Sequence, residues 1–456
     1  MPRHAGVTHE WPALGGMAAV FSPLFAAAMS RSPRLSRRHL LATSPGLLAL
    51  SLSACGGGSD SSGKAQIRVL NLSSDVGSLD IDLDAATWVS GATTAQLTAY
   101  KEVDPDSYDF SLRRTGSTIA LTSGERTLSK DAHYTLVVWG RETALTFVTL
   151  TEDEDPDDVD SGKARIRVYN ASADSGTLDL YLTSTAVDLQ DTTPAQSAVG
   201  AGLLSGYRDM SAGTYRLRVT GYGDASDLRL DVDAIALAAK TFTTVILTGT
   251  SSGVLVNGYA LSQQGTVTPM ATGKARVRVV ASADNRGAVG VSWAGQQLAA
   301  ALSSPTVGPY SSVDAGTQTL NVLVNGQLVS SGQRTLAVGV DYTLMVWGNG
   351  GVSLIADDNR LPTSSARVKL RLIHGSAGTE PLTMAVDYSV TASGVAQGAA
   401  SGFSTLNASS SVRLDVSTSS DQVYTDDDVT LTAQGVYTAF VLGGRTTPTG
   451  LLRKDR

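Results

Sequence analysis

The 456-residue chain has few of the residues that build metal and redox sites. It contains one cysteine and five histidines, and only His133 and His374 follow residue 54. A single thiol excludes an intramolecular disulfide. Because the two histidines are far apart along the chain, a zinc site of the Cys/His type cannot be assembled within one domain. No cofactor is therefore expected.

Basic and aromatic residues are also scarce. The chain has 35 Lys and Arg against 42 Asp and Glu, a net charge of -7, and 6% aromatic residues. Five of its basic residues precede position 54, so the rest of the chain is more acidic than this total. Such a surface suits phosphate backbones poorly, and we expect no nucleic-acid partner. Glycine, by contrast, is abundant, with 46 residues, which is typical of a turn-rich fold.

Residues 1–54 have the layout of an export signal. Arg37 and Arg38 stand just before an apolar run, Leu40–Leu52, that is too short to span a bilayer and is followed by small residues. The arginine pair resembles a twin-arginine signal, with general secretion as the alternative route. Met29 would begin a signal of ordinary length, so we expect it to be the true start.

The only cysteine, Cys55, lies in a lipobox. Leu52, Ser53 and Ala54 precede it, and residues 55–63 then form a flexible Gly/Ser tether. We expect Cys55 to carry diacylglycerol and, after acylation of its amino group, several lipid chains that anchor the protein stably. A cysteine buried in a core is the alternative, but the adjoining tether disfavours it. Gly56, rather than Asp, is typical of sorting to the outer membrane in a Gram-negative cell.

The body of the chain contains one unit four times. Strand-like segments that alternate apolar with basic residues recur at intervals of 99, 111 and 91 residues, and each unit ends in another apolar strand. Short strands separated by Gly, Ser, Asn and Asp turns predict an all-β fold of four tandem immunoglobulin-like β-sandwich domains. The expected domains are residues 64–150, 163–265, 274–361 and 365–456, with an acidic linker at 151–162.

These repeats resemble a known family. The Ala-Arg-Val-Arg-Val openings, the stretches Asn170-Ala171-Ser172 and His374-Gly375-Ser376, and the closing Tyr-Thr strands resemble the bacterial domain of unknown function 4397 family. The resemblance covers most of residues 64–456. The second repeat is nearest to the family pattern, and the first lacks its Ala-Gly-Thr turn. The resemblance implies an extracytoplasmic, immunoglobulin-like module that often occurs on lipoproteins, with no established activity and no catalytic residues.

The basic residues of the opening strands are expected on an outward face. Second strands with acidic residues would lie beside them, so we expect a solvated face with cross-strand salt bridges rather than a basic ligand-binding stripe. The basic residues are Arg68, Arg165, Arg167, Arg276, Arg278, Arg367, Lys369 and Arg371, and the acidic ones are Asp80, Asp82 and Asp179.

An acidic stretch, residues 152–158, joins the first two repeats. Several carboxylates could hold Ca²⁺ between domains, and the candidate ligands are Asp153, Asp155, Asp157 and Asp158. The alternative is a stiff, self-repelling linker in which Pro156 blocks helix and strand. No EF-hand spacing is present, and we expect the linker.

Several other residues fit the fold better than a site. Tyr100, Tyr207, Tyr310 and Phe403 recur once per repeat and are expected as core or sheet-edge aromatics rather than stacking platforms, and Trp139 and Trp347 are expected in the core. The two histidines are expected at loops or strand edges. Residues 249–253 fit Gly-x-Ser-x-Gly, but a nucleophile elbow needs a strand-to-helix turn, which an all-β context lacks.

Together these features predict a protein that is not an enzyme. We expect a lipid-anchored lipoprotein of the bacterial cell envelope, exported to the outer membrane, whose repeats form a binding, adhesion or display array. Its expected partners are the membrane, through the lipid on Cys55, and a glycan or envelope protein. A carbohydrate-active enzyme or accessory module and a purely structural envelope protein are the alternatives.

Overall fold

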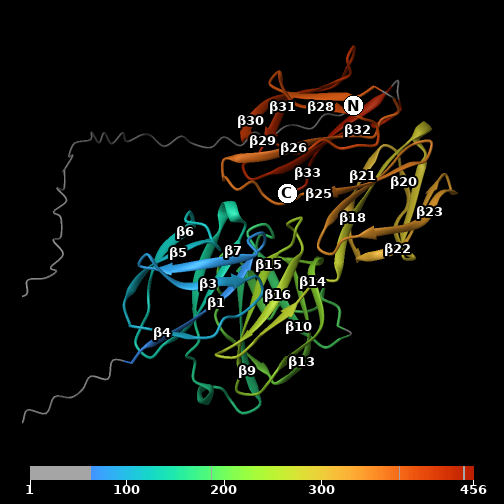
Figure 1. The fold of residues 1–456 in the computed structure, drawn as a ribbon. Coiled ribbons are helices and arrows are strands. Elements are labelled where there is room, and N and C mark those ends of the chain that lie inside the picture. Colours follow the sequence, from blue (N-terminus) through green and yellow to red (C-terminus); the bar gives the residue numbers. More distant parts are fainter. Residues whose placement is uncertain (1–62, 186, 379, 445–446) are drawn as a thin grey trace, which may run out of the picture. The chain divides into compact units, whose positions relative to one another are not determined.

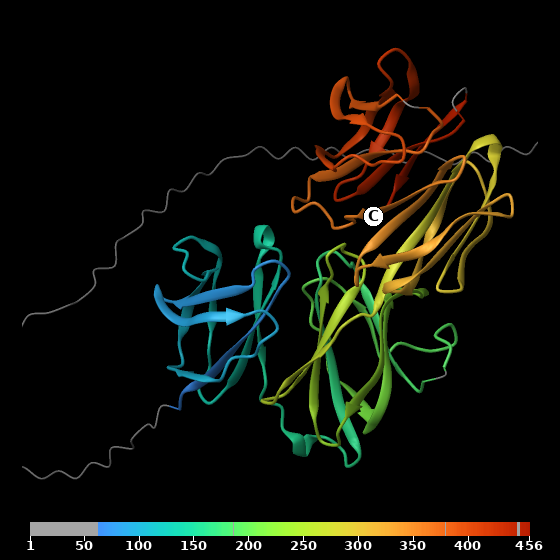
Figure 2. The ribbon, with the colours of Figure 1, turned by 45° about the vertical axis from the view of Figure 1, so that its right-hand side comes forward.

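The computed structural model describes residues 63–185, 187–378, 380–444 and 447–456. The predicted signal peptide with Met29, Arg37, Arg38, Leu52 and Ala54, the lipidation site Cys55 and most of the tether lie outside the described residues. The described part of the chain contains 33 strands and three short 3₁₀ helices, arranged as eight sheets of four or five strands. Figure 1 and Figure 2 show them as successive colours, from blue to red along the chain.

The first sandwich pairs the sheet β4-β1-β7-β8 with the sheet β3-β2-β5-β6. Its strands are β1 (Ala65–Ser73), β2 (Ser78–Leu83), β3 (Ala86–Thr93), β4 (Lys101–Val103), β5 (Ser107–Arg114), β6 (Ala120–Thr127), β7 (His133–Gly140) and β8 (Thr146–Thr151), with the 3₁₀ helix η1 (Glu142–Ala144) before β8.

The second sandwich pairs β12-β9-β15-β16-β17 with β11-β10-β13-β14. The 3₁₀ helix η2 (Pro156–Asp158) precedes it. Its strands are β9 (Lys163–Ala171), β10 (Leu178–Thr183), β11 (Gln196–Val199), β12 (Arg208–Ser211), β13 (Gly213–Gly221), β14 (Asp224–Leu237), β15 (Phe242–Gly249), β16 (Val256–Ser262) and β17 (Val267–Met270).

The third sandwich pairs β21-β18-β24-β25 with β20-β19-β22-β23. Its strands are β18 (Lys274–Ala283), β19 (Ala288–Trp293), β20 (Gln296–Ser303), β21 (Thr306–Asp314), β22 (Gly316–Val324), β23 (Gln327–Leu336), β24 (Asp341–Gly348) and β25 (Gly351–Asp357), with the 3₁₀ helix η3 (Asp284–Arg286) after β18.

The fourth sandwich pairs β29-β26-β32-β33 with β28-β27-β30-β31. Its strands are β26 (Arg367–His374), β27 (Leu382–Val386), β28 (Ser389–Val395), β29 (Ser404–Asn407), β30 (Ser409–Ser417), β31 (Gln422–Leu431), β32 (Val436–Gly443) and β33 (Pro448–Lys454). The predicted all-β fold of four tandem sandwiches is therefore confirmed.

In each sandwich the opening strand pairs in parallel with the closing strand. These pairs are β1 with β7, β9 with β15, β18 with β24 and β26 with β32. The opening strands are buried on both faces. In β1, Ile67 and Val69 enter the core of the first sandwich, whereas Leu70 and Leu72 enter an apolar cluster shared with the second sandwich. The prediction that one face of these strands points outward to solvent is therefore wrong.

The opening and second strands lie in different sheets. β1 belongs to the sheet of β7, and β2 belongs to the sheet of β3 and β5. The predicted cross-strand pairs between the opening-strand arginines and Asp80, Asp82 or Asp179 are therefore wrong, because these strands face each other across the core instead of sharing backbone hydrogen bonds. Sequence adjacency does not imply pairing when a chain alternates between the two sheets of a sandwich.

We predict that Leu136→Ala lowers the free energy of unfolding by about 2–5 kcal/mol, because Leu136 on β7 is 0% exposed and its loss leaves a cavity. Urea denaturation measures the change. Ile119→Ala is the control, since Ile119 is 74% exposed, and it should change stability by no more than about 0.5 kcal/mol. Equal effects of the two substitutions would contradict the placement of the core.

Candidate functional site

One arginine of each opening strand is buried. Arg68, Arg167, Arg278 and Arg371 are each no more than 6% exposed. Lys369 is also buried, Arg165 and Arg276 are half-buried, and Arg367 is exposed. The prediction of a solvated basic face is wrong for these four arginines, because the face that they share meets another sandwich.

Each buried arginine sits in the same small group of side chains, which we call the arginine unit. Its Nε donates to a threonine on the closing strand, at 2.8–3.1 Å, and an aromatic ring lies against its guanidinium, with the ring centroid at 4.5–4.8 Å. The units are Arg68, Thr135 and Tyr100; Arg167, Thr244 and Tyr207; Arg278, Thr343 and Tyr310; and Arg371, Thr438 and Phe403. The aromatics that recur once per repeat thus stack on buried cations.

A carboxylate completes three of the four units. On the antiparallel strand beside the closing strand, one residue pairs with the threonine, and the carboxylate stands two residues after it. Glu152, Asp357 and Asp455 occupy this equivalent position. The same register places the neutral Gln263 in the second repeat. Thr135, Thr343 and Thr438 donate to these carboxylates.

The third and fourth sandwiches exchange their carboxylates. Arg278 of the third hydrogen-bonds Asp455 of the fourth, and Arg371 of the fourth hydrogen-bonds Asp357 of the third at 2.5 Å. Tyr310 donates to Asp357 at 2.7 Å. Burial, and next the charge of Asp357, raises the pKa of the Tyr310 phenol well above its ordinary value, so the hydroxyl stays protonated as a donor.

The first and second sandwiches use a different arrangement. Glu152 pairs with Arg68 of its own repeat at 2.7 Å, and Arg68 also donates to the Gly265 carbonyl of the second repeat at 2.6 Å. Arg167 donates to the Thr151 carbonyl at 2.8 Å. Glu152 is 3% exposed, so the prediction that it belongs to a solvated linker is wrong. It holds two sandwiches together.

Apolar clusters surround these polar contacts. Leu70, Val137 and Trp139 of the first sandwich pack with Tyr169 and Ile246 of the second. A matching cluster of the third and fourth sandwiches contains Val280, Met345, Ile373, Phe440 and Leu442, with Trp347 packed against it. The two tryptophans predicted in the core therefore lie between sandwiches. Sandwiches one and two, and three and four, are joined as pairs.

The four candidate calcium ligands contact different partners and do not converge on one point. Asp153 contacts the His133 ring, Asp155 accepts from the Asp157 amide at the start of η2, and Asp157 pairs with Lys240. Asp158 uses its carbonyl to accept from Arg165. Within the described residues, no three His, Cys, Asp or Glu side chains converge where they could hold a metal. Pro156 begins η2, so it does not block helical structure there.

The acidic residues of the second strands brace hairpins. Asp80 accepts from Ser90, from the amides of Gly91 and Gly116, and from Arg113. Burial alone would raise the pKa of this carboxyl, but these hydrogen bonds and the charge of Arg113 lower it to about 2. Asp82 pairs with Arg113, and Asp179 repeats the role of Asp80 in the second sandwich.

Residues 249–253 comprise the last residue of β15 and part of the loop to β16, with no helix after them. Ser252 is buried and bridges to the third sandwich, because its hydroxyl donates to the Gly339 carbonyl and accepts from the Asp341 amide. The loop therefore makes a contact between repeats next to the pattern serine, Ser251, and it lacks the strand-to-helix turn of a nucleophile elbow.

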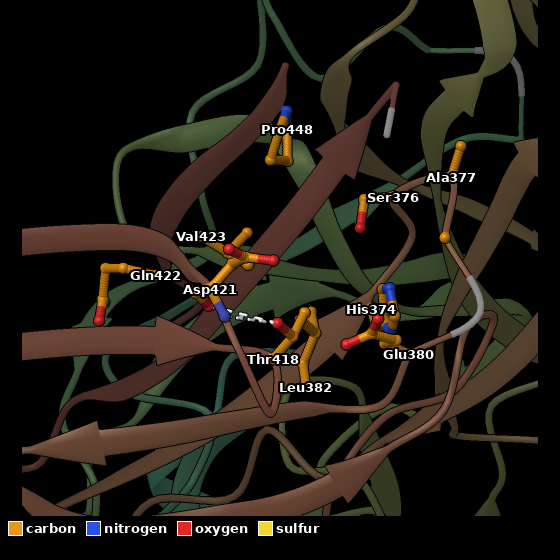
Figure 3. A pocket seen from close by; sticks show the side chains of 11 residues that line it. His374, Ser376, Ala377, Glu380, Leu382, Thr418, Asp421, Gln422, Val423 and Pro448 are labelled. Atoms are coloured by element: carbon orange, nitrogen blue, oxygen red, sulfur yellow. Dashed lines mark hydrogen bonds between the residues drawn. The ribbon is translucent and has the colours of Figure 1, made fainter. Parts of the chain in front are cut away.

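A pocket of about 280 Å³ opens at one end of the fourth sandwich (Figure 3). It lies between residues 374–378, 380 and 382 and the β30–β31 turn, beside Pro448. Its polar lining includes Ser376, Glu380, Thr418, Asp421 and Gln422. His374, the last residue of β26, is 1% exposed and also lines the pocket. Sequence reasoning missed this pocket.

His374 occupies a position that asparagine holds in the first two repeats. Asn71 and Asn170 each lie three residues after the buried arginine and donate to the carbonyls of Ala92 and Val199. His374 makes the equivalent hydrogen bond, from Nδ1 to the Val395 carbonyl at 3.0 Å. Because a carbonyl only accepts, Nδ1 carries the proton. Burial lowers the pKa of the ring, more than this hydrogen bond raises it.

The fold and its contacts define a tandem β-sandwich protein in which buried arginines join neighbouring domains. Within the described part of the chain, no helix is long and apolar enough to cross a membrane. Residues 65–181 and 275–383 match the model of the family described as Domain of unknown function (DUF4397). These two stretches belong to this family, as the resemblance of the repeats indicates.

Other comparisons give distant likenesses or none. No curated protein matches the chain. One similar solved structure concerns alpha-glucan recognition by family 41 carbohydrate-binding modules from streptococcal virulence factors; it has 13% identity and a TM-score of 0.16, over 40% of this chain and 93% of that one. A second is CBMbc of family CBM26 from Eubacterium rectale Amy13K in complex with maltoheptaose, with 12% identity and a TM-score of 0.15, over 45% and 95%.

A third is the Bacillus anthracis TIE protein, with 8% identity and a TM-score of 0.14, over 80% of this chain and 66% of that one. TM-scores this low carry no argument about the function of the chain.

We predict that Asp357→Asn lowers the free energy of unfolding by about 3–5 kcal/mol, because it leaves the buried guanidinium of Arg371 without its counter-charge. Urea denaturation followed by circular dichroism measures the loss. Asp427→Asn is the matched control: its carboxylate pairs with Arg413 but is 72% exposed, so we expect about 0–1 kcal/mol. A loss no larger than that of the control would show that the pair does not stabilise the interface.

We also predict a pH effect from His374. Its folded pKa lies below the ordinary 6.5, so the unfolded chain binds the proton more tightly and stability falls as pH drops below about 6.5. The slope cannot exceed about 1.4 kcal/mol per pH unit for one group. Denaturation at about pH 7.5 and about pH 5.5 should show a smaller fall for His374→Asn than for the wild type. If stability falls equally in the wild type and the variant, the pH effect does not come from His374.

Proposed function

We propose that the protein is a lipid-anchored, non-catalytic display protein of the bacterial cell envelope. The observation that carries the proposal is the place of Cys55. It follows an apolar run and small residues, precedes a glycine-rich segment, and is the only thiol in the chain. Lipid on this residue fixes the chain to a membrane, and several acyl chains make the attachment stable.

The buried polar contacts favour display over catalysis. A catalytic site needs polar groups that can reach a substrate. In the described residues, the arginine units have the most concentrated buried charge, and their partners are the threonines, aromatics and carboxylates of the same or the adjoining sandwich. The arginine side chains are 3–5% exposed wherever an ion pair includes them. These groups hold domains in fixed pairs, which suits a protein that presents surfaces.

The described sandwiches also offer several related surfaces on one anchored chain. An anchored array with more than one binding surface gains effective concentration for a second contact once the first has formed. The proposed partners are therefore the membrane, through Cys55, and a glycan or protein of the envelope. The proposed location is the outer membrane, because Gly56 rather than Asp follows the cysteine.

We predict that wild-type protein made in cells fed an alkyne-bearing fatty acid becomes labelled, and that Cys55→Ser abolishes the label, because serine has no thiol to receive the diacylglycerol. Gel fluorescence after coupling to a dye measures it. Ser59→Ala, four residues further on, is the control and should label like the wild type. Unlabelled wild type, or a labelled Cys55→Ser variant, would overturn the proposed anchor.

A further inference from the structure

The pocket of the fourth sandwich differs from the same place in the first two sandwiches in how its loop is tied. Asn71 uses its amide and carbonyl groups to bind the Val76 carbonyl and the amide and hydroxyl of Ser73. Asn170 likewise binds the Gly176 carbonyl and the Ser172 amide. In both repeats the asparagine therefore fastens the following loop over the end of the sandwich.

His374 keeps only one of these contacts. It bonds the hairpin carbonyl of Val395, and it has no bond to the loop that follows it among the described residues. Its Nε2 has no hydrogen-bond partner in the described structure, although the side chain is 1% exposed and lines the pocket. The ring therefore presents a polar atom that a molecule in the pocket can reach and use as a hydrogen-bond partner.

The strongest polar groups of the pocket are hydrogen-bond acceptors. Because Nδ1 carries the proton of the neutral ring, Nε2 presents a lone pair. The carboxylates of Glu380 and Asp421 line the same pocket, and neither has an ion-pair partner among the described residues. Among the described residues, the Glu380 carboxylate accepts a hydrogen bond from Ser419 alone, at 3.4 Å, and the Asp421 carboxylate from Ser420 alone, at 2.8 Å.

The rest of the lining limits the ligand. Leu382, Val423 and Pro448 provide apolar walls, and Thr418 has its hydroxyl engaged within the β30–β31 turn. The volume of about 280 Å³ suits a molecule of a few heavy atoms rather than a polymer. Two unpaired negative charges and a lone pair call for hydrogen-bond donors that carry positive charge.

We propose that this pocket binds a small organic cation with a primary amine, whose ammonium group donates to His374 Nε2 and to Glu380 or Asp421 while its carbon chain lies against the apolar wall. The proposal rests on the proposed function, since it makes the fourth sandwich the ligand-bearing surface of the anchored protein. Repeats one and two, with their asparagines, do not share it.

Isothermal titration calorimetry of the full chain in detergent tests the proposal, with butane-1,4-diamine as the probe. Butane-1,4-diol is the matched neutral probe and glucose is a neutral sugar. At pH 7 the amine is charged, as lysine is. We expect the diamine to bind at least about tenfold more tightly than the diol or glucose. Equal binding of a neutral probe, or no binding of the diamine, overturns the proposal.

Variants locate the binding. Glu380→Gln and Asp421→Asn should each lower the affinity for the diamine by about tenfold. Both residues are exposed, so the fold should remain intact. Asp428→Asn is the control, because Asp428 is an exposed acid of the same sandwich outside the pocket. His374→Asn introduces the residue of repeats one and two and should abolish binding. If Asp428→Asn weakens binding as much as Glu380→Gln, the attraction is non-specific and the pocket assignment is wrong.

The outcome is separable from that of the anchor. Fatty-acid labelling of Cys55 does not depend on the pocket, so a labelled protein that ignores the diamine removes only the present inference. An unlabelled protein that binds the diamine with the expected variant pattern removes the anchor and leaves the pocket.

Discussion

The arrangement of this protein depends on one constraint: a guanidinium removed from water must keep its hydrogen bonds and its counter-charge. Each opening strand places an arginine on the face that meets another part of the chain. Threonine, an aromatic ring and, in three repeats, a carboxylate then surround it. The apolar clusters supply area, but they are non-directional. The arginine units fix which surfaces meet and in what register, because their donors must find particular oxygens.

Much of the fold could be predicted from the sequence. Apolar residues at every second position predicted the strands, and the recurrence of these segments predicted the four sandwiches. The same alternation predicted the wrong environment for Arg68, Arg167, Arg278 and Arg371. The alternation of apolar and basic residues distinguishes the two faces of a strand, but it does not indicate whether the second face meets water or a neighbouring sheet. A signal was present, because an aromatic residue in each repeat, and in three repeats an acid at or just after the end of the last strand, accompany the arginines.

The pocket could not have been found in this way. His374 and Asn170 occupy equivalent positions, and the resemblance of the openings covers both residues. Their difference matters only through geometry, because asparagine can reach the hairpin and the loop together, while the histidine ring reaches the hairpin alone. Glu380 and Asp421 are about forty residues apart along the chain, and only the closure of the sandwich places them at one opening.

Gln263 carries a consequence for how such a chain can be inherited. Where the third and fourth repeats each lend an acid to the other, the second repeat has a neutral amide, and Glu152 turns to the arginine of its own repeat. The third repeat moved alone would bring Arg278 without Asp455, and the fourth repeat would bring Arg371 without Asp357. The smallest piece of this part of the chain that can be transplanted with its ion pairs intact is therefore the couple formed by the third and fourth sandwiches.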